Sequence, residues 1–412
     1  IAGHDAASAA PLLESLWRKK GIAFSVDLLG EACVSADEAL AYQAKYLDLV
    51  ATLPRLVQDW PADERLERDH LGAIPRTNVS VKISALHSEM DPIATPAVID
   101  ALRRTLRPIL EAARDAGVFI NFDMEQHELK DLTLELFMRC CEDVDFHAGL
   151  AMQAYLRSGP DDARRIIDWS RATGRRVTVR LVKGAYWDFE TIHAEEMGWP
   201  VPVWSRKVET DACFERMTRQ FIEATPRTAG EGGVTLALGS HNARSIATAL
   251  ALLERHDLPR SAIELQMLHG MGEELKAAGR ELGLRVREYV PVGEMVPGMA
   301  YLVRRLLENT SNESWLKAGF QDEAEAGALL ASPHEPEDAI SRPDAAVQTA
   351  PEHHRLSPAV AGVGDGRPFV SEPLRDFSNT RVRDAFASAV GTASVPGIAV
   401  NASEADADAV MD

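Results

Sequence analysis

The middle of the chain reads Val177-Thr178-Val179-Arg180-Leu181-Val182-Lys183-Gly184-Ala185-Tyr186-Trp187-Asp188. The first half of this stretch has the β-branched and apolar residues of a buried parallel strand, yet it carries two cations, Arg180 and Lys183. A buried charge needs a partner, so these cations either form ion pairs with acidic neighbours or bind an anionic ligand at the strand end. Gly184 would allow a ligand close to the backbone, and the aromatic residues after it would supply flat walls for a ring system. Both interpretations stay open at this point.

Eight apolar runs of strand length occur along the chain, with stretches long enough for amphipathic helices between most of them. The runs cover residues 24–29, 79–84, 119–123, 150–155, 177–184, 236–240, 263–268 and 286–292. Helix ends are marked by a capping box at Ser35 and Glu38, by a start at Thr95 with an end at Gly117, and by an end at Gly174. Repeated strand and helix units imply a parallel sheet, and eight of them predict an α/β fold of the closed (βα)8 TIM-barrel type.

The composition excludes several classes of protein. The 412 residues carry a formal charge of -19, which argues against a nucleic-acid surface. No apolar run approaches the roughly 20 residues of a membrane-spanning helix, and the start has no signal-peptide pattern. Four cysteines without metal-ligand spacing predict buried free thiols in a reducing compartment, hence a cytoplasmic location and no metal site. The chain starts without Met, so we expect it to be a fragment of a longer protein.

Polar residues stand at the carboxyl end of every predicted strand, where the active site of such a barrel lies. They are Asp27 and Glu31, Lys82, Asp123 and Glu125, Gln153 and Tyr155, Arg180 and Lys183, His241 and Asn242, Gln266 and His269, and Tyr289. Any one of them alone is more often a satisfied rim residue. Eight strand ends that all carry polar groups indicate a functional site.

Residues 300–309 predict a helix after the last strand. Tyr301, Arg304, Arg305 and Glu308 share one side of it, because they lie three or four positions apart. This side is either a solvated charged stripe or a bidentate clamp for a carboxylate, and the residues alone favour the stripe.

Five motifs in order give the chain a specific resemblance to a known family. They lie at residues 27–31, 82–87, 180–188, 268–273 and 301–309. In these motifs the chain resembles the proline dehydrogenase domain of the bifunctional bacterial proline utilisation A (PutA) flavoproteins. The resemblance implies a distorted (βα)8 barrel over residues 1–320 with the last helix over its mouth. An acidic linker rich in Ala and Pro at 321–367 and the truncated start of an aldehyde dehydrogenase-like region at 368–412 would follow.

The resemblance also implies a cofactor, FAD held without a covalent bond. Arg180 would approach the reactive N5 side of the flavin. The other cofactor-binding residues would be Gln153, Lys183, Gly184, Ala185, Trp187, Ser205, His241, Asn242 and Gln266. Ser205 stands where the family pattern has a threonine, so a hydroxyl is kept.

A substrate site is implied in the same way. Lys82, Arg304 and Arg305 would hold the proline carboxylate, and Glu31 would pair with Arg304 as a gate. The pocket would be shaped by Asp123, Tyr186, Leu268, Tyr289, Tyr301 and Glu308. The residues closest to the chemistry would be Lys82, Asp123, Arg180, Tyr289, Arg304 and Arg305.

The implied reaction is the oxidation of L-proline to 1-pyrroline-5-carboxylate by hydride transfer to flavin N5. Electrons would pass to a membrane quinone, which predicts peripheral membrane association, and the aldehyde dehydrogenase domain of the full-length chain would be a partner. One alternative is a barrel aldolase or decarboxylase that uses Lys82 or Lys183 as a Schiff-base amine. A second alternative, a DNA-binding repressor fragment, conflicts with the acidic charge, so no nucleic-acid partner is expected.

Overall fold

The computed structural model describes residues 1–30, 32–296, 298–299, 301–303, 330–334 and 374–392 of the chain. Eight parallel strands close into a barrel with the order β1-β10-β9-β8-β7-β6-β5-β4, which confirms the predicted (βα)8 type. β1 pairs with both β10 and β4 and so closes the sheet. The barrel strands are β1 (Ala23–Leu28), β4 (Asn78–Val81), β5 (Phe119–Phe122), β6 (His147–Gln153), β7 (Arg176–Val182), β8 (Gly233–Gly239), β9 (Ile263–Leu268) and β10 (Arg285–Val292).

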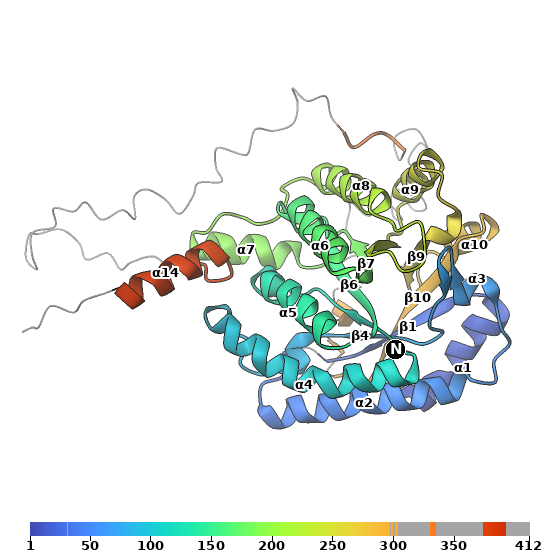
Figure 1. Ribbon diagram of the computed structural model, residues 1–412, viewed down its shortest axis with the longest axis horizontal. Helices are drawn as coiled ribbons and strands as arrows, with labels where there is room; N and C mark the ends of the chain where they lie inside the picture. The colour runs from blue at the N-terminus through green and yellow to red at the C-terminus, as the bar shows by residue number, and fades with distance from the viewer. Residues whose placement is uncertain (31, 297, 300, 304–329, 335–373, 393–412) are drawn as a thin grey trace, which may run out of the picture.

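Helices surround the barrel (Figure 1). They are α1 (Ala6–Ser15), α2 (Ala36–Val57), α3 (Glu64–Glu67), α4 (Thr95–Ala116), α5 (Lys130–Asp143), α6 (Gly159–Thr173), α7 (Trp187–Met197), α8 (Lys207–Glu223), α9 (Ala243–Arg255) and α10 (Glu273–Glu281). Two short strands, β2 (Arg68–Asp69) and β3 (Gly72–Ala73), form a separate antiparallel pair. The last described element is α14 (Thr380–Thr392).

The predicted helix ends are largely confirmed. Gly117 and Gly174 end α4 and α6 in the left-handed conformation, with φ of 65° and 69°. The Ser35 hydroxyl caps α2 by accepting from the Glu38 N–H at 3.2 Å. The capping box is only half formed, because the Glu38 carboxylate accepts from the Val34 N–H at 2.8 Å and not from the N–H of Ser35.

Several predicted strands end one to three residues early, and the largest difference is at the run 79–84. The run 79–84 becomes β4, which ends at Val81, followed by a 3₁₀ turn at Ile83–Ala85. The turn brings the Ser84 N–H to 3.1 Å from a carboxylate oxygen of Glu125, in the loop after β5. We attribute the early end of β4 to this contact with Glu125, which is distant in the sequence.

The two faces of the barrel strands differ in polarity. In β4, Val79 and Val81 are buried among apolar residues, whereas Ser80 takes part in hydrogen bonds across the barrel. Helix α4 buries its own apolar side, including Leu102 and Leu106. Each such side chain contributes about 1.5–3 kcal/mol of hydrophobic stabilisation when fully buried. The apolar core therefore lies between strands and helices, and the barrel centre is left to polar groups.

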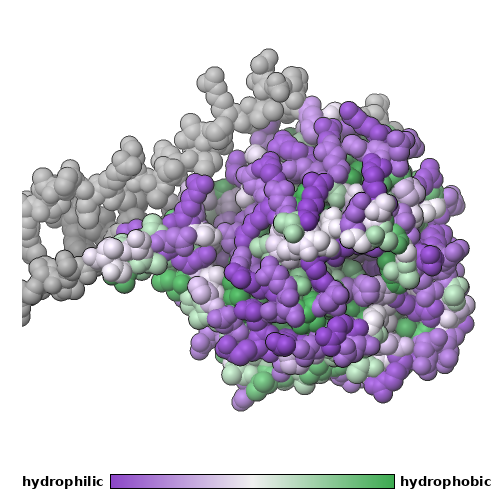
Figure 2. Space-filling view, in the orientation of Figure 1, coloured by the Kyte–Doolittle hydropathy of each residue, from purple (hydrophilic) through white to green (hydrophobic). Residues whose placement is uncertain are grey.

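Leu374 and Thr380, before and at the start of α14, form hydrogen bonds with the barrel domain. The Trp199 indole donates to the Leu374 carbonyl at 2.8 Å, and the Thr380 hydroxyl donates to Asp131 at 3.3 Å. Most of the face in Figure 2 is hydrophilic, with hydrophobic residues scattered over it. Helix α14 falls in the predicted aldehyde dehydrogenase-like region, and the domain limits stay predictions. No described helix is long and apolar enough to cross a bilayer.

Candidate active site

Five charged or phenolic side chains meet at the carboxyl ends of the barrel strands. This central cluster consists of Asp27 from β1, Lys82 after β4, Asp123 after β5, Arg180 from β7 and Tyr289 from β10. Asp123 is its hub: it accepts from Arg180 Nη1 at 2.6 Å, from the Tyr289 hydroxyl at 2.6 Å and from Lys82 Nζ at 3.3 Å. Lys82 also pairs with Asp27. Four sequence-predicted residues are thus brought together by strands that are far apart in the chain.

The electrostatics of the central cluster favour the charged forms of Lys82 and of the hub carboxylate. Burial alone would raise the pKa of Asp123, but Lys82 and Arg180 outweigh it and hold that pKa below the usual value. Burial would lower the pKa of Lys82, yet the carboxylate of Asp27 leads the interactions that raise it well above the usual value. Burial and the Asp123 carboxylate raise the pKa of Tyr289, so its hydroxyl stays a donor. Burial raises the pKa of the second carboxyl group, Asp27, although its pairing with Lys82 opposes this shift.

Arg180 is fixed in position by four further contacts. Its guanidinium donates to Gln266 Oε1 at 2.6 Å, to Ser80 Oγ at 3.0 Å and to Ser25 Oγ at 3.4 Å. It also lies 5.0 Å from the centroid of the Tyr289 ring. The structure therefore bears out the ion-pair interpretation for Arg180, and the hydrogen bonds fix the direction in which it can meet a ligand.

The strands beside Arg180 carry small residues. Ala151 and Ala237 are its register partners on β6 and β8, and Gly239 is the partner of Gln266. Register partners lie on one face of a sheet, so the short side chains of Ala151 and Ala237 flank the guanidinium. Gly239 is closely packed, because a Cβ there would meet Val182 at 2.7 Å. The buried Gln153 side-chain oxygen has no hydrogen-bond partner in the described part of the chain. A buried amide oxygen without a partner and small neighbours fit a flat bound group with polar edges.

The turn after β7 carries four of the residues predicted to bind the cofactor. Lys183 pairs with Asp211, and burial lowers its pKa. Gly184 has φ of +133°, and a Cβ there would meet the Tyr155 ring at 2.4 Å, so this position requires glycine. Ala185 is half-buried. Trp187 is 42% exposed.

The remaining predicted cofactor residues make local contacts. His241 Nε2 accepts from the Leu268 N–H at 3.3 Å, and the Asn242 side chain caps α9. Ser205 is exposed and its hydroxyl accepts from Arg157 at 3.2 Å. These contacts are compatible with a rim around the mouth, and the cofactor role of the three residues stays a prediction.

The predicted substrate side of the mouth is described in part. Residues 301–303 are helical, as expected, and the Tyr301 ring stacks on Tyr289 with centroids 6.5 Å apart. Tyr186 and Leu268 are half-buried at the ends of β7 and β9. The clamp and gate residues Glu31, Arg304, Arg305 and Glu308 lie outside the described residues, so their arrangement stays a prediction.

Sequence reasoning did not assign several polar residues below the mouth. Ser25, Ser80 and Asn121 bond the central cluster from within the barrel, and Asp27 was noted at a strand end without a role. A signal for them exists in the sequence. Polar residues recur every second position in otherwise apolar strands, as in Ser25 with Asp27, which is the period of side chains on one face.

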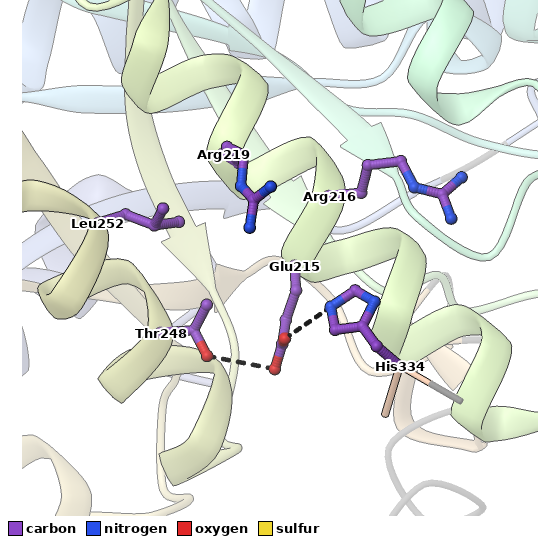
Figure 3. Close-up of a pocket in the computed structure, with 6 residues that line it drawn as sticks. All are labelled: Glu215, Arg216, Arg219, Thr248, Leu252 and His334. Carbon is purple, nitrogen blue, oxygen red and sulfur yellow. Dashed lines mark hydrogen bonds and ion pairs between the residues drawn. The ribbon is translucent and has the colours of Figure 1, made fainter. Parts of the chain in front are cut away.

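A separate pocket of about 360 Å³ lies on the outer face of α8 and α9 (Figure 3). Its lining residues are Glu215, Arg216, Arg219, Thr248, Leu252 and His334. The buried Glu215 carboxylate pairs with Arg244 at 2.8 Å and with the His334 ring at 3.0 Å. The pocket therefore marks where residues 330–334 attach to the helices, and none of its lining residues belongs to the central cluster.

The family sequence model described as "Proline dehydrogenase" matches residues 13–318. The bifunctional protein PutA of Escherichia coli (strain K12) is 31% identical over 326 residues, which cover 76% of this chain and 23% of that protein. The proline dehydrogenase of Deinococcus radiodurans is 27% identical over 321 residues, covering 78% of this chain and 88% of that protein.

A solved structure agrees with both sequence matches. The crystal structure of PutA from Bdellovibrio bacteriovorus inactivated by N-propargylglycine has a TM-score of 0.82 and 39% identity, covering 95% of this chain and 39% of that chain. This chain spans about a quarter of the length of the curated PutA relatives it matches. The family match extends over most of the chain, and the chain belongs to the proline dehydrogenase family.

Proposed function

We propose that the chain catalyses the FAD-dependent oxidation of L-proline to 1-pyrroline-5-carboxylate by hydride transfer to flavin N5, with electrons passing on to a quinone. The observation that carries this proposal is the buried Arg180, held by Asp123 and Gln266 at the barrel mouth in a chain of this family. The quinone and the aldehyde dehydrogenase partner rest on the resemblance to PutA.

The residues around Arg180 fit a flavin. Ala151 and Ala237 flank the guanidinium with short side chains, and the Gln153 side-chain oxygen could accept from a polar edge of the ring system. Lys183 is a cation suited to the phosphate groups. When bound, the flavin would supply the redox chemistry that no protein side chain provides, by accepting a hydride, which is two electrons and one proton, from proline.

The protein then has to hold an anionic substrate and exclude water. Lys82 and Arg180 are each paired with a carboxyl group of the central cluster, so we assign the further positive charge for the substrate carboxylate to Arg304 and Arg305, as the family resemblance implies. Lys82 would orient the carboxylate. Tyr289 and Tyr301 would close one side of the pocket with their stacked rings.

The Schiff-base alternative has less support. Interactions led by Asp27 raise the pKa of Lys82 well above its usual value despite burial, so its amine is protonated and a poor nucleophile. Burial lowers the pKa of Lys183, but this lysine is ion-paired with Asp211. Membership of the proline dehydrogenase family favours redox chemistry over Schiff-base chemistry on either lysine.

Product formation tests the proposal. The purified protein is supplied with L-proline and a soluble quinone analogue, and 1-pyrroline-5-carboxylate is measured. We expect product with the quinone analogue and no product from D-proline. Borohydride trapping of a carbonyl substrate on Lys82 or Lys183 in a protein without bound flavin would instead favour the Schiff-base alternative.

A further inference from the structure

A buried carboxylate outside the central cluster has no role in the function proposed above. Glu190 on α7 is 4% exposed, although its neighbours Phe189 and Ile192 on the same helix are 45% and 55% exposed. Its Oε1 accepts from the backbone N–H of His127 at 2.7 Å. No cation lies within ion-pair distance of Glu190 among the described residues. A buried carboxylate that accepts a backbone hydrogen bond without a cation is costly to keep, which calls for an explanation.

The hydrogen bond from His127 joins two segments at the barrel mouth. His127 begins the turn that follows the loop from Asp123 to Glu125, which holds the hub of the central cluster. Glu190 lies in the first turn of α7, and its own N–H donates to the Tyr186 carbonyl at 2.9 Å. The single contact therefore links the loop after β5 to the aromatic residues after β7.

A third segment meets the same carboxylate. Tyr155 follows β6, and its hydroxyl and the Glu190 carboxylate influence each other's pKa. The Tyr155 ring supports Gly184, and its N–H donates to the Lys183 carbonyl at 2.7 Å. Glu190 thus belongs to the segment after β7, bonds the segment after β5 and lies near Tyr155 of the segment after β6. These segments carry residues predicted to bind cofactor and substrate.

The charge of Glu190 is sensitive to its surroundings. Burial, followed by repulsion from Glu128, raises its pKa to about 7, and the hydrogen bond from the His127 backbone acts in the opposite direction. A neutral side chain of the same shape would keep the His127 contact without this cost.

We propose that Glu190 is a positioning residue, which sets the separation between the Asp123 loop and the Tyr186–Trp187 wall of the mouth. The inference rests on the proposed function. It predicts that the hydrogen bond, not the charge, matters, because the contact with His127 is made by an acceptor oxygen. The alternative is that Glu190 only stabilises the fold and does not affect the geometry of the mouth.

Three variants separate these possibilities. Glu190→Gln keeps an acceptor oxygen, Glu190→Ala removes it, and Glu195→Ala is a matched control at an exposed position of the same helix. Amide hydrogen exchange at His127 reports the contact without any catalysis. Bound flavin, kcat and KM for proline, and the thermal midpoint are measured on the same preparations.

We expect Glu190→Ala to speed exchange at His127 by about tenfold to a hundredfold, the range for losing a hydrogen bond to a charged acceptor. The same variant should lower kcat/KM at least about tenfold while flavin stays bound, and Glu190→Gln should stay within about threefold of wild type in both measurements. Glu190→Asp replaces the alanine variant if that protein does not fold, because the shorter side chain withdraws the oxygen.

Normal kcat/KM in Glu190→Ala, or equal losses in the glutamine and alanine variants, would overturn the inference. Equal losses in Glu195→Ala would do so as well, because they would point to a general effect on α7. A wild-type protein that binds flavin but does not oxidise proline would instead contradict the proposed function, and exchange at His127 would still test the link.

Discussion

Replacing the hub carboxylate by its neutral isostere, Asp123→Asn, tests whether the central cluster is one electrostatic unit. The carboxylate accepts from Arg180, Lys82 and Tyr289, and the asparagine amide would direct N–H donors at some of these same donors. Removing one partner of a buried ion pair typically costs about 3–5 kcal/mol. Asp27 still neutralises Lys82, so we expect the lower end, about 3 kcal/mol in the free energy of unfolding at pH 7.

The pH dependence of this cost has a definite sign. The folded-state pKa of Asp123 is lowered despite burial, mainly by Lys82 and Arg180, so its contribution is present above the unfolded value of about 3.9 and is lost as the pH falls through the folded value. Urea unfolding followed by tryptophan fluorescence measures it. The control Asp115→Asn changes an exposed carboxylate, 68% accessible, and should leave the free energy of unfolding nearly unchanged. A cost below about 1 kcal/mol for Asp123→Asn would refute the coupled cluster.

Three further outcomes are expected. Arg305→Met should leave flavin bound but lower kcat/KM for proline by about 30-fold to several thousand-fold, whereas a residue of a solvated stripe would change it less than about threefold. Gly184→Ala should destabilise the protein by about 1–3 kcal/mol and reduce bound flavin, because φ is +133° and Tyr155 fills the space; Gly198→Ala, with φ of +68° and open space, should leave flavin content unchanged. Burial raises the pKa of Glu190 to about 7, so its stabilisation is present below about pH 4.5 and lost as the pH rises through 7. Thermal unfolding should therefore show that the stability of Glu190→Gln increases relative to wild type between about pH 5 and pH 8. A constant difference in stability would contradict this.

The fold could be predicted because parallel strands covered by helices leave a local signal. Their outward residues are apolar, and glycines such as Gly117 and Gly174 end the helices by adopting positive φ. The end of β4 could not be predicted, because it depends on a contact between Ser84 and Glu125 in the loop after the next barrel strand. Local pattern contains no information on such a partner.

In the candidate site, too, local sequence reveals some residues and only the folded structure reveals others. Arg180 was found because a cation inside an apolar strand is unusual in itself. The role of Asp27 became visible only when the barrel closed and placed it beside Lys82, 55 positions away. Glu190 looks like an ordinary helix residue in the sequence, since its partner His127 is 63 positions away. The roles of Asp27 and Glu190 both depend on contacts between residues that are far apart in the sequence.

The central claim, that this barrel oxidises proline with a bound flavin, is tested most directly by anaerobic mixing of the purified protein with L-proline. The visible absorption of the flavin is recorded before mixing, after mixing and after addition of a quinone analogue or NAD. We predict that L-proline alone bleaches the flavin absorption and that the quinone analogue, not NAD, restores it. A flavin-containing protein whose spectrum L-proline leaves unchanged, or changes only when NAD is present, would contradict the claim.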